Sequence, residues 1–268
     1  MHNTSEKLTP VICPYCGVGC GLYIKSIDSR YVGIEYWYDH PVNSGRLCPK
    51  PNDLSFINSP DRLRKPLKRV ESGFKEISWS DAIREVATRL KEIAKQYGPD
   101  SLGFLASAKC FNEENYLMQK LARILGTNNV DHCARLCHAP TLLGMGRTTG
   151  VGALTATFED IANSDVIVVW GANPAETFPV LMGSYILRAK RRGSKLIVVG
   201  PVKNRTAWHA DIFIPIKPGT DIAVANALMH VLIKENLYDK EFVKSRVEGF
   251  DKLLPVIEKY TPEFAEEI

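Results

Sequence analysis

Seven cysteines are the residues of this chain best suited to chemistry, and four of them lie within its first 48 positions. Cys13, Cys16 and Cys20 form a C-x2-C-x3-C pattern, and Cys48 follows after a gap of 27 residues. Clustered thiols in a reducing compartment more often bind metal than form disulfides. Three close cysteines and a remote fourth suit a 4Fe-4S cubane, in which each iron takes one thiolate. A four-cysteine zinc site is the alternative, although zinc knuckles usually pair two C-x2-C units.

Three glycines lie among or directly beside the first three cysteines. Gly17, Gly19 and Gly21 tolerate a positive φ and a close approach of the backbone. We therefore expect a tight loop that directs three sulfur atoms inward and aims its backbone N–H groups at the sulfides of a cluster.

Composition and charge exclude several classes of protein. With 268 residues, 45% of them hydrophobic and 24% charged, the chain has room for one large globular domain or two modest ones. Its net charge of +4 is small, and its basic stretches at 62–69 and 188–195 resemble a solvated linker and a helix end, so no nucleic-acid partner is expected. No apolar run approaches the roughly 18 residues that a membrane span needs. Residues 1–12 lack the pattern of a signal peptide or a twin arginine, so a cytoplasmic location is expected.

Local patterns indicate which elements must position the cysteines and the loops that follow them. Residues 21–27 and 31–38 are rich in β-branched and aromatic residues, and Asp28-Ser29-Arg30 between them is a hairpin signal. A polar, proline-bearing link is expected at 58–78. A helix with apolar residues at 3/4 spacing should begin at the capping pair Ser80-Asp81 and end at Gly98-Pro99. Further strands are expected at 102–106, 165–170, 195–199 and 211–216, and further helices at 115–125, 179–191 and 222–235.

The alternation of strands and helices predicts right-handed crossovers and a parallel sheet. The predicted fold is α/β: a small β-rich module at 6–61, then a doubly wound, mainly parallel sheet flanked by helices at 62–268. Ligands bind such sheets beyond the carboxyl ends of the strands, where the loops at 171–177, 200–204 and 217–221 lie. Two of these loops precede helices, whose N-termini can hold phosphate, but the chain has no G-x-G-x-x-G and no P-loop. A nucleotide-bearing cofactor and ordinary capped turns both stay open at this point.

Two segments taken together resemble a known family. The cysteine pattern that ends in Cys48-Pro49-Lys50, combined with Asn-Val-Asp-His-Cys-Ala-Arg-Leu-Cys-His at 129–138, is similar to the catalytic subunits of molybdenum- or tungsten-dependent formate dehydrogenases. These belong to the bis-molybdopterin guanine dinucleotide oxidoreductases. The likeness covers the whole chain and includes Tyr-Gly-Pro-Asp at 97–100, Asn-Tyr-Leu-Met-Gln-Lys at 115–120, Glu-Asn-Leu-Tyr-Asp at 235–239 and Tyr-Thr-Pro-Glu at 260–263.

The resemblance implies two redox centres, a 4Fe-4S cluster and a molybdenum or tungsten ion held by two molybdopterin guanine dinucleotides. The ligands implied for the cluster are Cys13, Cys16, Cys20 and Cys48. Lys50 would lie between cluster and pterin, where an ammonium group stabilises the reduced cluster and raises its potential. Cys137 matches the cysteine or selenocysteine that ligates the metal, and its place before Pro140 suggests a thiolate at a helix N-terminus. His138 would take the proton as formate becomes carbon dioxide.

The remaining site residues follow from the same resemblance. Arg135 would contact pterin, whereas Cys110 and Cys133 are interpreted as buried core cysteines. The guanine nucleotide would be lined by Gly171, Asn173, Glu176 and Thr177, with Pro201, Gly219 and Asp221 in the next two loops and Asp221 accepting from the guanine edge. The family typically has Asp-Pro-Arg after the second strand. Here Gly200-Pro201-Val202 stands in its place, so the loop can persist through Pro201 and Lys203 but the acid for the ribose is missing.

Family members run several hundred residues further, so the resemblance predicts the N-terminal part of such a subunit, with the second dinucleotide half absent. The chain would be truncated, split, or completed by a separate C-terminal polypeptide. Formate and carbon dioxide are the implied substrate pair, and a ferredoxin-like, flavin or hydrogenase subunit would take the electrons. A nitrate reductase, a formylmethanofuran dehydrogenase, a non-catalytic iron–sulfur partner and a zinc-bearing nucleic-acid module are the alternatives.

Overall fold

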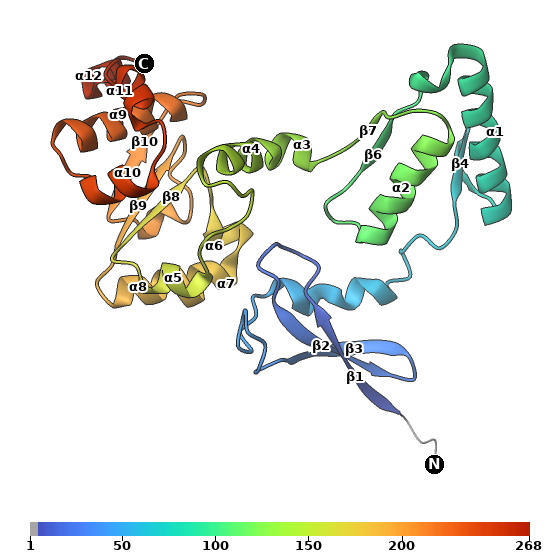
Figure 1. The fold of residues 1–268 in the computed structure, drawn as a ribbon. Coiled ribbons are helices and arrows are strands. Elements are labelled where there is room, and N and C mark those ends of the chain that lie inside the picture. The colour runs from blue at the N-terminus through green and yellow to red at the C-terminus, as the bar shows by residue number, and fades with distance from the viewer. Residues whose placement is uncertain (1–4) are drawn as a thin grey trace. The chain divides into compact units, whose positions relative to one another are not determined.

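The computed structural model describes residues 5–268, with every side chain except that of Ile57 (Figure 1). The chain forms two compact units. The first contains the residues up to Tyr15 together with Gly19–Thr157, and the second contains Cys16–Val18 together with Phe158–Ile268. Three residues of the cysteine loop therefore belong to the second unit.

The first unit begins with a three-stranded antiparallel sheet in the order β1-β2-β3. Its strands are β1 (Glu6–Ile12), β2 (Gly21–Ile27) and β3 (Arg30–Tyr36). Asp28 and Ser29 connect β2 to β3 with φ of 49° and 64°, as a tight two-residue hairpin turn requires. The predicted hairpin is confirmed, and β3 ends two residues before the predicted boundary. Strand β1 was not expected; Pro10 is tolerated in it because β1 lies at an edge of the sheet.

The segment predicted as a polar link contains a second hairpin. A 3-10 helix, η1 (Lys50–Asn58), leads to β4 (Leu67–Val70) and β5 (Gly73–Glu76), which pair antiparallel. Every residue of these two short strands is exposed. Without a buried face they lack the alternation of apolar and polar residues that identifies a strand in a sequence.

Helix α1 (Trp79–Tyr97) starts at an N-cap two residues earlier than predicted, because Ser78 rather than Ser80 accepts the backbone N–H of Asp81 at 3.1 Å. It is followed by η2 (Pro99–Ser101), β6 (Phe104–Ala106), α2 (Asn112–Ile124) and β7 (Val130–His132). Strands β6 and β7 pair in parallel. The core of this region consists of Leu102, Phe104 and Ala122, with Leu90, Ile93, Ala94, Met118, Leu125 and Val130 packed against them. Two short helices, α3 (Ala134–Cys137) and α4 (Ala139–Thr148), follow.

The second unit has a parallel three-stranded sheet in the order β10-β9-β8 (Figure 1). The strands are β8 (Val166–Trp170), β9 (Lys195–Gly200) and β10 (Ile212–Pro215). The helices are α5 (Phe158–Asn163), α6 (Pro174–Thr177), α7 (Pro179–Leu181), the π-helix η3 (Met182–Ile186), α8 (Leu187–Arg191), η4 (Ala207–His209), α9 (Asp221–Lys234), α10 (Lys240–Arg246), α11 (Phe250–Ile257) and α12 (Pro262–Glu267). Its core joins alternate residues of β8 and β9 to the helix that connects them, and is made of Ile167, Val169, Met182, Ile186, Ala189, Leu196, Val198 and Ala207.

The α/β class, the β-rich start and the parallel strands flanked by helices are confirmed. The parallel strands divide between two sheets, β6-β7 in the first unit and β8-β9-β10 in the second, rather than forming one. Three helices, α3 to α5, stand between β7 and β8, and the helical segments α6, α7, η3 and α8 connect β8 to β9. Strand β9 pairs with both β8 and β10, so these three strands form one sheet.

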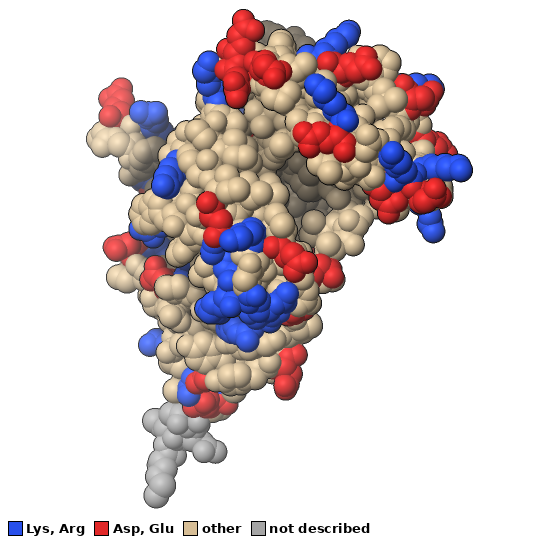
Figure 2. Space-filling view, turned by 90° about the vertical axis from the view of Figure 1, so that its left-hand side faces the viewer, with Lys and Arg blue, Asp and Glu red and all other residues tan. Residues whose placement is uncertain are grey.

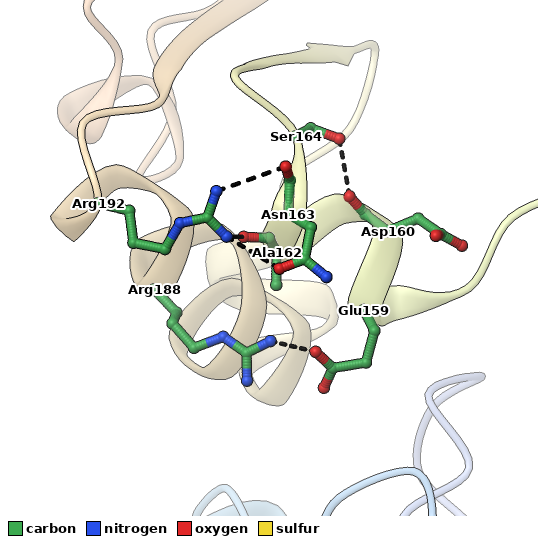
Figure 3. A network of polar contacts seen from close by, with 7 residues as sticks. All are labelled: Glu159, Asp160, Ala162, Asn163, Ser164, Arg188 and Arg192. Carbon is green, nitrogen blue, oxygen red and sulfur yellow. Dashed lines mark hydrogen bonds and ion pairs between the residues drawn. The ribbon is translucent and has the colours of Figure 1, made fainter.

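Helix α8 is tied to α5 by a network of polar contacts (Figure 3). Arg188 pairs with Glu159, and Arg192 donates to the carbonyl of Ala162 at 2.7 Å and to Oδ1 of Asn163 at 2.9 Å. Lys190 pairs with Asp211 at 2.6 Å. Three cations of the basic stretch at 188–195 therefore bind oxygen atoms of the chain itself.

The surface view shows acidic and basic side chains interspersed, with one group of Lys and Arg that acidic side chains border (Figure 2). Within residues 5–268, none of the helices is both long and apolar enough to cross a bilayer.

Candidate functional site

The antiparallel pairing of β1 with β2 brings two of the candidate cluster ligands together. Ile12, the last residue of β1, pairs with Gly21, the first residue of β2, so Cys13 and Cys20 flank a paired position. The backbone N–H of Cys13 donates to the carbonyl of Cys20 at 2.8 Å and closes the loop between them. The Cys20 side chain is buried, and that of Cys13 is half-buried.

The glycines of this loop have different roles. Gly19 has φ of +76°, as the prediction required. Gly21 has an ordinary φ, but a Cβ there would lie 2.2–2.8 Å from three atoms of the His40 ring, so only glycine fits. Gly17 uses neither kind of freedom: its φ is not positive, and a Cβ would make only an ordinary contact at 3.9 Å.

The segment before Cys48 is tied to the segment after Cys20 by a buried amide. Asn43, which is 1% exposed, donates from Nδ2 to the carbonyls of Gly21 at 3.0 Å and Arg46 at 2.9 Å. Its Oδ1 accepts the Gly21 N–H at 2.8 Å, and Nδ1 of the buried His40 accepts the same N–H at 3.2 Å. The sequence analysis did not identify His40 or Asn43. Two polar residues in a His-x-x-Asn segment between β3 and Cys48 could have indicated them.

Lys50 begins η1, two residues after Cys48, and its side chain is half-buried. Two tyrosines of this region have a raised pKa. Burial is the main cause that raises the pKa of Tyr15 and of Tyr31, and the carboxylate of Asp53 raises both further.

The donor chemistry of this region fits an iron–sulfur cluster. Within residues 5–268 no three His, Cys, Asp or Glu side chains converge closely enough to hold a single metal ion. A cubane does not require this, because each of its irons takes a separate thiolate. Thiols of Cys13, Cys20 and Cys48 lie on three segments of the first unit that backbone and Asn43 hydrogen bonds hold together. Cys16 lies in the three residues of the loop that belong to the second unit.

The candidate metal ligand and proton acceptor stand at the junction of two short helices. Cys137 is the last residue of α3, and His138 is the N-cap of α4, with Pro140 in the first turn as predicted. Cys137 therefore lies one residue before the helix N-terminus at which it was expected. Both side chains are exposed.

A cavity of about 530 Å³ lies at the carboxyl ends of the parallel strands β6 and β7. Its wall includes Ser107, Asn115, His132 and the ion pair of Arg135 with Asp131, whose Nε and Oδ2 lie 2.8 Å apart. The hydrogen bond from Arg135 lowers the pKa of Asp131, and the His132 backbone N–H lowers it further. The same bond raises the pKa of Arg135. Arg135 thus lines this cavity and is held there by its ion pair with Asp131.

The interpretation of Cys110 and Cys133 as buried core cysteines was wrong, since both are exposed. Cys110 lies in the turn after β6 and lines the same cavity, and Cys133 follows β7 directly. The Cys133 sulfur accepts the backbone N–H of Ala108 at 3.3 Å, so it links the two loops that leave the sheet. Residues at the carboxyl ends of these strands emerge at the surface rather than in the core.

In the second unit, a cavity of about 540 Å³ joins the loops after β8 and β9. Four of the predicted dinucleotide contacts line it, namely Gly171, Asn173, Thr177 and Pro201. Among the described residues, Glu176 is not part of this wall. It pairs with Arg205 at 3.4 Å.

Two residues that the sequence did not single out hold these loops. Thr206 is fully buried; its Oγ1 donates to Oδ1 of Asn173 at 2.8 Å and accepts the N–H of Ala175 at 3.0 Å. Asn204 donates to the carbonyl of Ala172 at 3.3 Å. The Asn173 side chain therefore organises the loop as well as lining the cavity.

In the third predicted loop, at 217–221, the carboxylate of Asp221 lies against the end of strand β8. Gly219 turns with φ of +89°, and Asp221 begins α9. Oδ1 of Asp221 accepts the indole N–H of Trp170, the last residue of β8, at 2.7 Å. Neither Gly219 nor Asp221 belongs to the described wall of the cavity at 171–204.

Comparison with known protein families identifies the family of this chain. Residues 6–57 match the molybdopterin oxidoreductase Fe4S4 domain, and residues 62–257 match the molybdopterin oxidoreductase family itself. The chain belongs to the molybdopterin oxidoreductase family. The two matched models support a 4Fe-4S cluster and a molybdopterin cofactor for this chain.

Relatives with assigned names include two formate dehydrogenases from distant organisms. The chain is 49% identical over 264 residues to the F420-dependent formate dehydrogenase subunit alpha of Methanocaldococcus jannaschii, and 41% identical over 271 residues to formate dehydrogenase H of Escherichia coli. Each alignment covers 98% of this chain and 38% of the relative.

Among solved structures, the acetylene hydratase of Pelobacter acetylenicus shares this fold, with a TM-score of 0.75 and 28% identity over 97% of this chain and 36% of that protein. This molybdopterin oxidoreductase chain thus spans well under half the length of the proteins that it matches.

Proposed function

We propose that this chain corresponds to the N-terminal part of the catalytic subunit of a formate dehydrogenase. The observation that carries the proposal is the similarity, over nearly the whole chain, to formate dehydrogenase subunits from two distant organisms. The Cys137-His138 pair, which follows the cavity-forming strand β7, supports it.

We propose two functional regions, a module at 6–61 that binds the iron–sulfur cluster and a first dinucleotide-binding region at 62–268. Cys13, Cys16, Cys20 and Cys48 would hold the 4Fe-4S cluster. Lys50 would stand between the cluster and the pterin with its ammonium group. Arg135 would contact the pterin, and the walls of the cavity between the β8 and β9 loops would receive a guanine nucleotide. The contacts proposed for the nucleotide are Gly171, Asn173, Glu176, Thr177, Pro201, Gly219 and Asp221.

Formate becomes carbon dioxide when it loses one proton and two electrons. The molybdenum or tungsten centre, when bound, supplies an acceptor for the two electrons. Cys137 would ligate that metal through its thiolate, and the imidazole of exposed His138 would take the proton at a ring nitrogen. The Lys50 ammonium would favour the more negative, reduced form of the cluster by electrostatic attraction.

Formate-dependent dye reduction by the complete assembly tests this proposal, with nitrate-dependent dye oxidation measured in parallel. We expect the first activity and not the second, and expect Cys137→Ser to abolish it while four irons per chain remain. Ser245→Ala, which changes an exposed residue of α10 outside the described walls of both cavities, is the control. Nitrate reduction without formate oxidation would overturn the proposal.

A second candidate is another enzyme of the same family, such as a nitrate reductase or formylmethanofuran dehydrogenase. It stays open because the fold is shared with a solved protein that is not a formate dehydrogenase, the acetylene hydratase. A non-catalytic iron–sulfur partner is a further alternative, and it predicts a cluster without molybdenum or tungsten. Metal analysis after co-expression with neighbouring genes separates these cases.

The proposed partners are an electron-transfer subunit of ferredoxin-like, flavin or hydrogenase type, and a separate C-terminal polypeptide that completes the catalytic subunit. The cytoplasmic location expected from the sequence stays a prediction. Fractionation of cells that express the complete assembly would test it.

A further inference from the structure

Asn43 has an unusual set of bonds for a side chain outside any helix or strand. It lies in the connection between β3 and Cys48, is 1% exposed, and makes three hydrogen bonds to backbone groups. Two of them are to the N–H and the carbonyl of Gly21, as a neighbouring strand would make, and the third is to the carbonyl of Arg46.

The three hydrogen bonds of Asn43 reach residues that lie close in sequence to two of the proposed cluster ligands. Gly21 directly follows Cys20, and Arg46 stands two residues before Cys48. One buried amide group therefore joins the segment of the third cysteine to the segment of the fourth, across 22 positions of sequence in one case and three in the other.

The side chains of His40 and Asn43 together fix the position of the Gly21 backbone. The His40 ring covers the face of Gly21 on which a Cβ would stand, and Trp37 packs against that ring with centroids 4.9 Å apart. Nδ1 of His40 accepts the same Gly21 N–H that Asn43 accepts, so both partners act on one peptide group.

We propose that Asn43 is a positioning residue for the iron–sulfur cluster, which sets the separation of the Cys20 and Cys48 sulfurs by clamping Gly21 to Arg46. The proposal rests on the ligand set proposed above. Only an amide can fill this position, because it offers two N–H donors to two carbonyls and an acceptor to an N–H. In Asn43→Asp the side chain can still accept the Gly21 N–H, but a carboxylate oxygen replaces the NH2 group and repels the carbonyl oxygens of Gly21 and Arg46.

The test uses Asn43→Ala and Asn43→Asp in the chain purified anaerobically with its cluster. Iron release to a chelator, the electron paramagnetic resonance spectrum of the reduced cluster and its reduction potential are measured. We expect release to accelerate about tenfold or more in Asn43→Ala, because the carbonyls of Gly21 and Arg46 both lose the amide that binds them. Leaving even one buried polar group unpaired has an effect of that size. The reduced spectrum and the potential should shift in both variants.

The matched control is Thr127→Val, which removes another buried polar side chain of the same unit, 2% exposed. That side chain bonds Asp100 and Asn129, which are remote in sequence from the four proposed cluster ligands. The Tm of each variant is measured as well, so that a shift in the spectrum or the potential is compared with the loss of stability in the same variant. If Thr127→Val shifts the spectrum and potential as much as Asn43→Ala, or if Asn43→Ala shifts neither, the proposal is wrong.

A companion variant separates this proposal from the ligand assignment. Cys20→Ser should lose the four-iron cluster if the ligand set is right. An intact cluster in Cys20→Ser contradicts the ligand set. Loss of the cluster in Cys20→Ser together with unchanged spectra in both Asn43 variants contradicts the positioning role alone.

Discussion

The cysteine loop and the Cys137-His138 segment differ in how firmly the chain itself holds them. Gly21, next to Cys20, is bound by two side chains that are 1% and 7% exposed, those of Asn43 and His40. Cys137 and His138 are both exposed, and neighbouring Leu136 is 88% exposed. The first region is organised by buried hydrogen bonds, and the second depends on two short helices. Substitutions should therefore cost stability in the first region and chemistry in the second.

The largest difference is expected between Cys20→Ser and Cys137→Ser. The first variant should lose the cluster and a large part of its thermal stability, because a bound group stabilises the fold that binds it. The second should keep its iron and its Tm, because an exposed side chain is replaced by a similar one. Iron analysis and thermal unfolding measure both effects. Equal losses in the two variants would show that the regions do not differ.

Gly21→Ala should destabilise the first region by about 1–3 kcal/mol, the usual cost of overpacking a filled site. The new methyl group would collide with the buried His40 ring. Chemical denaturation measures the free energy of unfolding. The control is Gly33→Ala in β3 of the same sheet, where a Cβ meets nothing within 4 Å and little change is expected. A Gly21→Ala variant as stable as Gly33→Ala would show that the His40 ring moves aside freely.

The loops after β8 and β9 extend the comparison to the second unit. Thr206→Val leaves Asn173 and the Ala175 N–H without their buried partner, so we expect a loss of about 1–2 kcal/mol in the free energy of unfolding. Thr148→Val in α4 removes an exposed hydroxyl and should change stability by less than about 0.5 kcal/mol. If the two variants are equally stable, buried hydroxyl bonding does not distinguish these loops from the Cys137 region.

The smallest effect concerns Asp131, whose pKa is lowered by its bond to Arg135. A lowered pKa means that the folded chain binds fewer protons than the unfolded chain as the pH falls below the ordinary aspartate pKa of about 4. The contribution of Asp131 to stability should be complete above that pH and lost as the pH falls through the folded pKa. Thermal unfolding of wild type and Asp131→Asn should thus differ slightly at pH 7 and converge in acid. In an Arg135→Gln background the difference at pH 7 should shrink to the smaller part that the His132 backbone N–H contributes. An undiminished difference would show that Arg135 is not the main cause of the pKa shift.

Local patterns predicted the regular elements well where one face is buried. Strand β2 has the predicted bounds, and helix α9 begins and ends one residue before its predicted limits. The missed strands lack a buried face or are very short: β1, β4 and β5 have no fully buried residue, and β7 has three residues. Such strands carry no periodicity that a sequence pattern can detect.

The sequence by itself determined the kinds of groups that can do chemistry and the spacing of the cysteines along the chain, and through them the family. Only the tertiary structure decided which side chains hold those groups, such as Asn43 on Gly21 and Thr206 on Asn173, and that Cys110 and Cys133 are exposed. The physical reason is that a residue's type fixes what its side chain can bind, whereas its burial and its partners depend on segments 22 to 33 positions away.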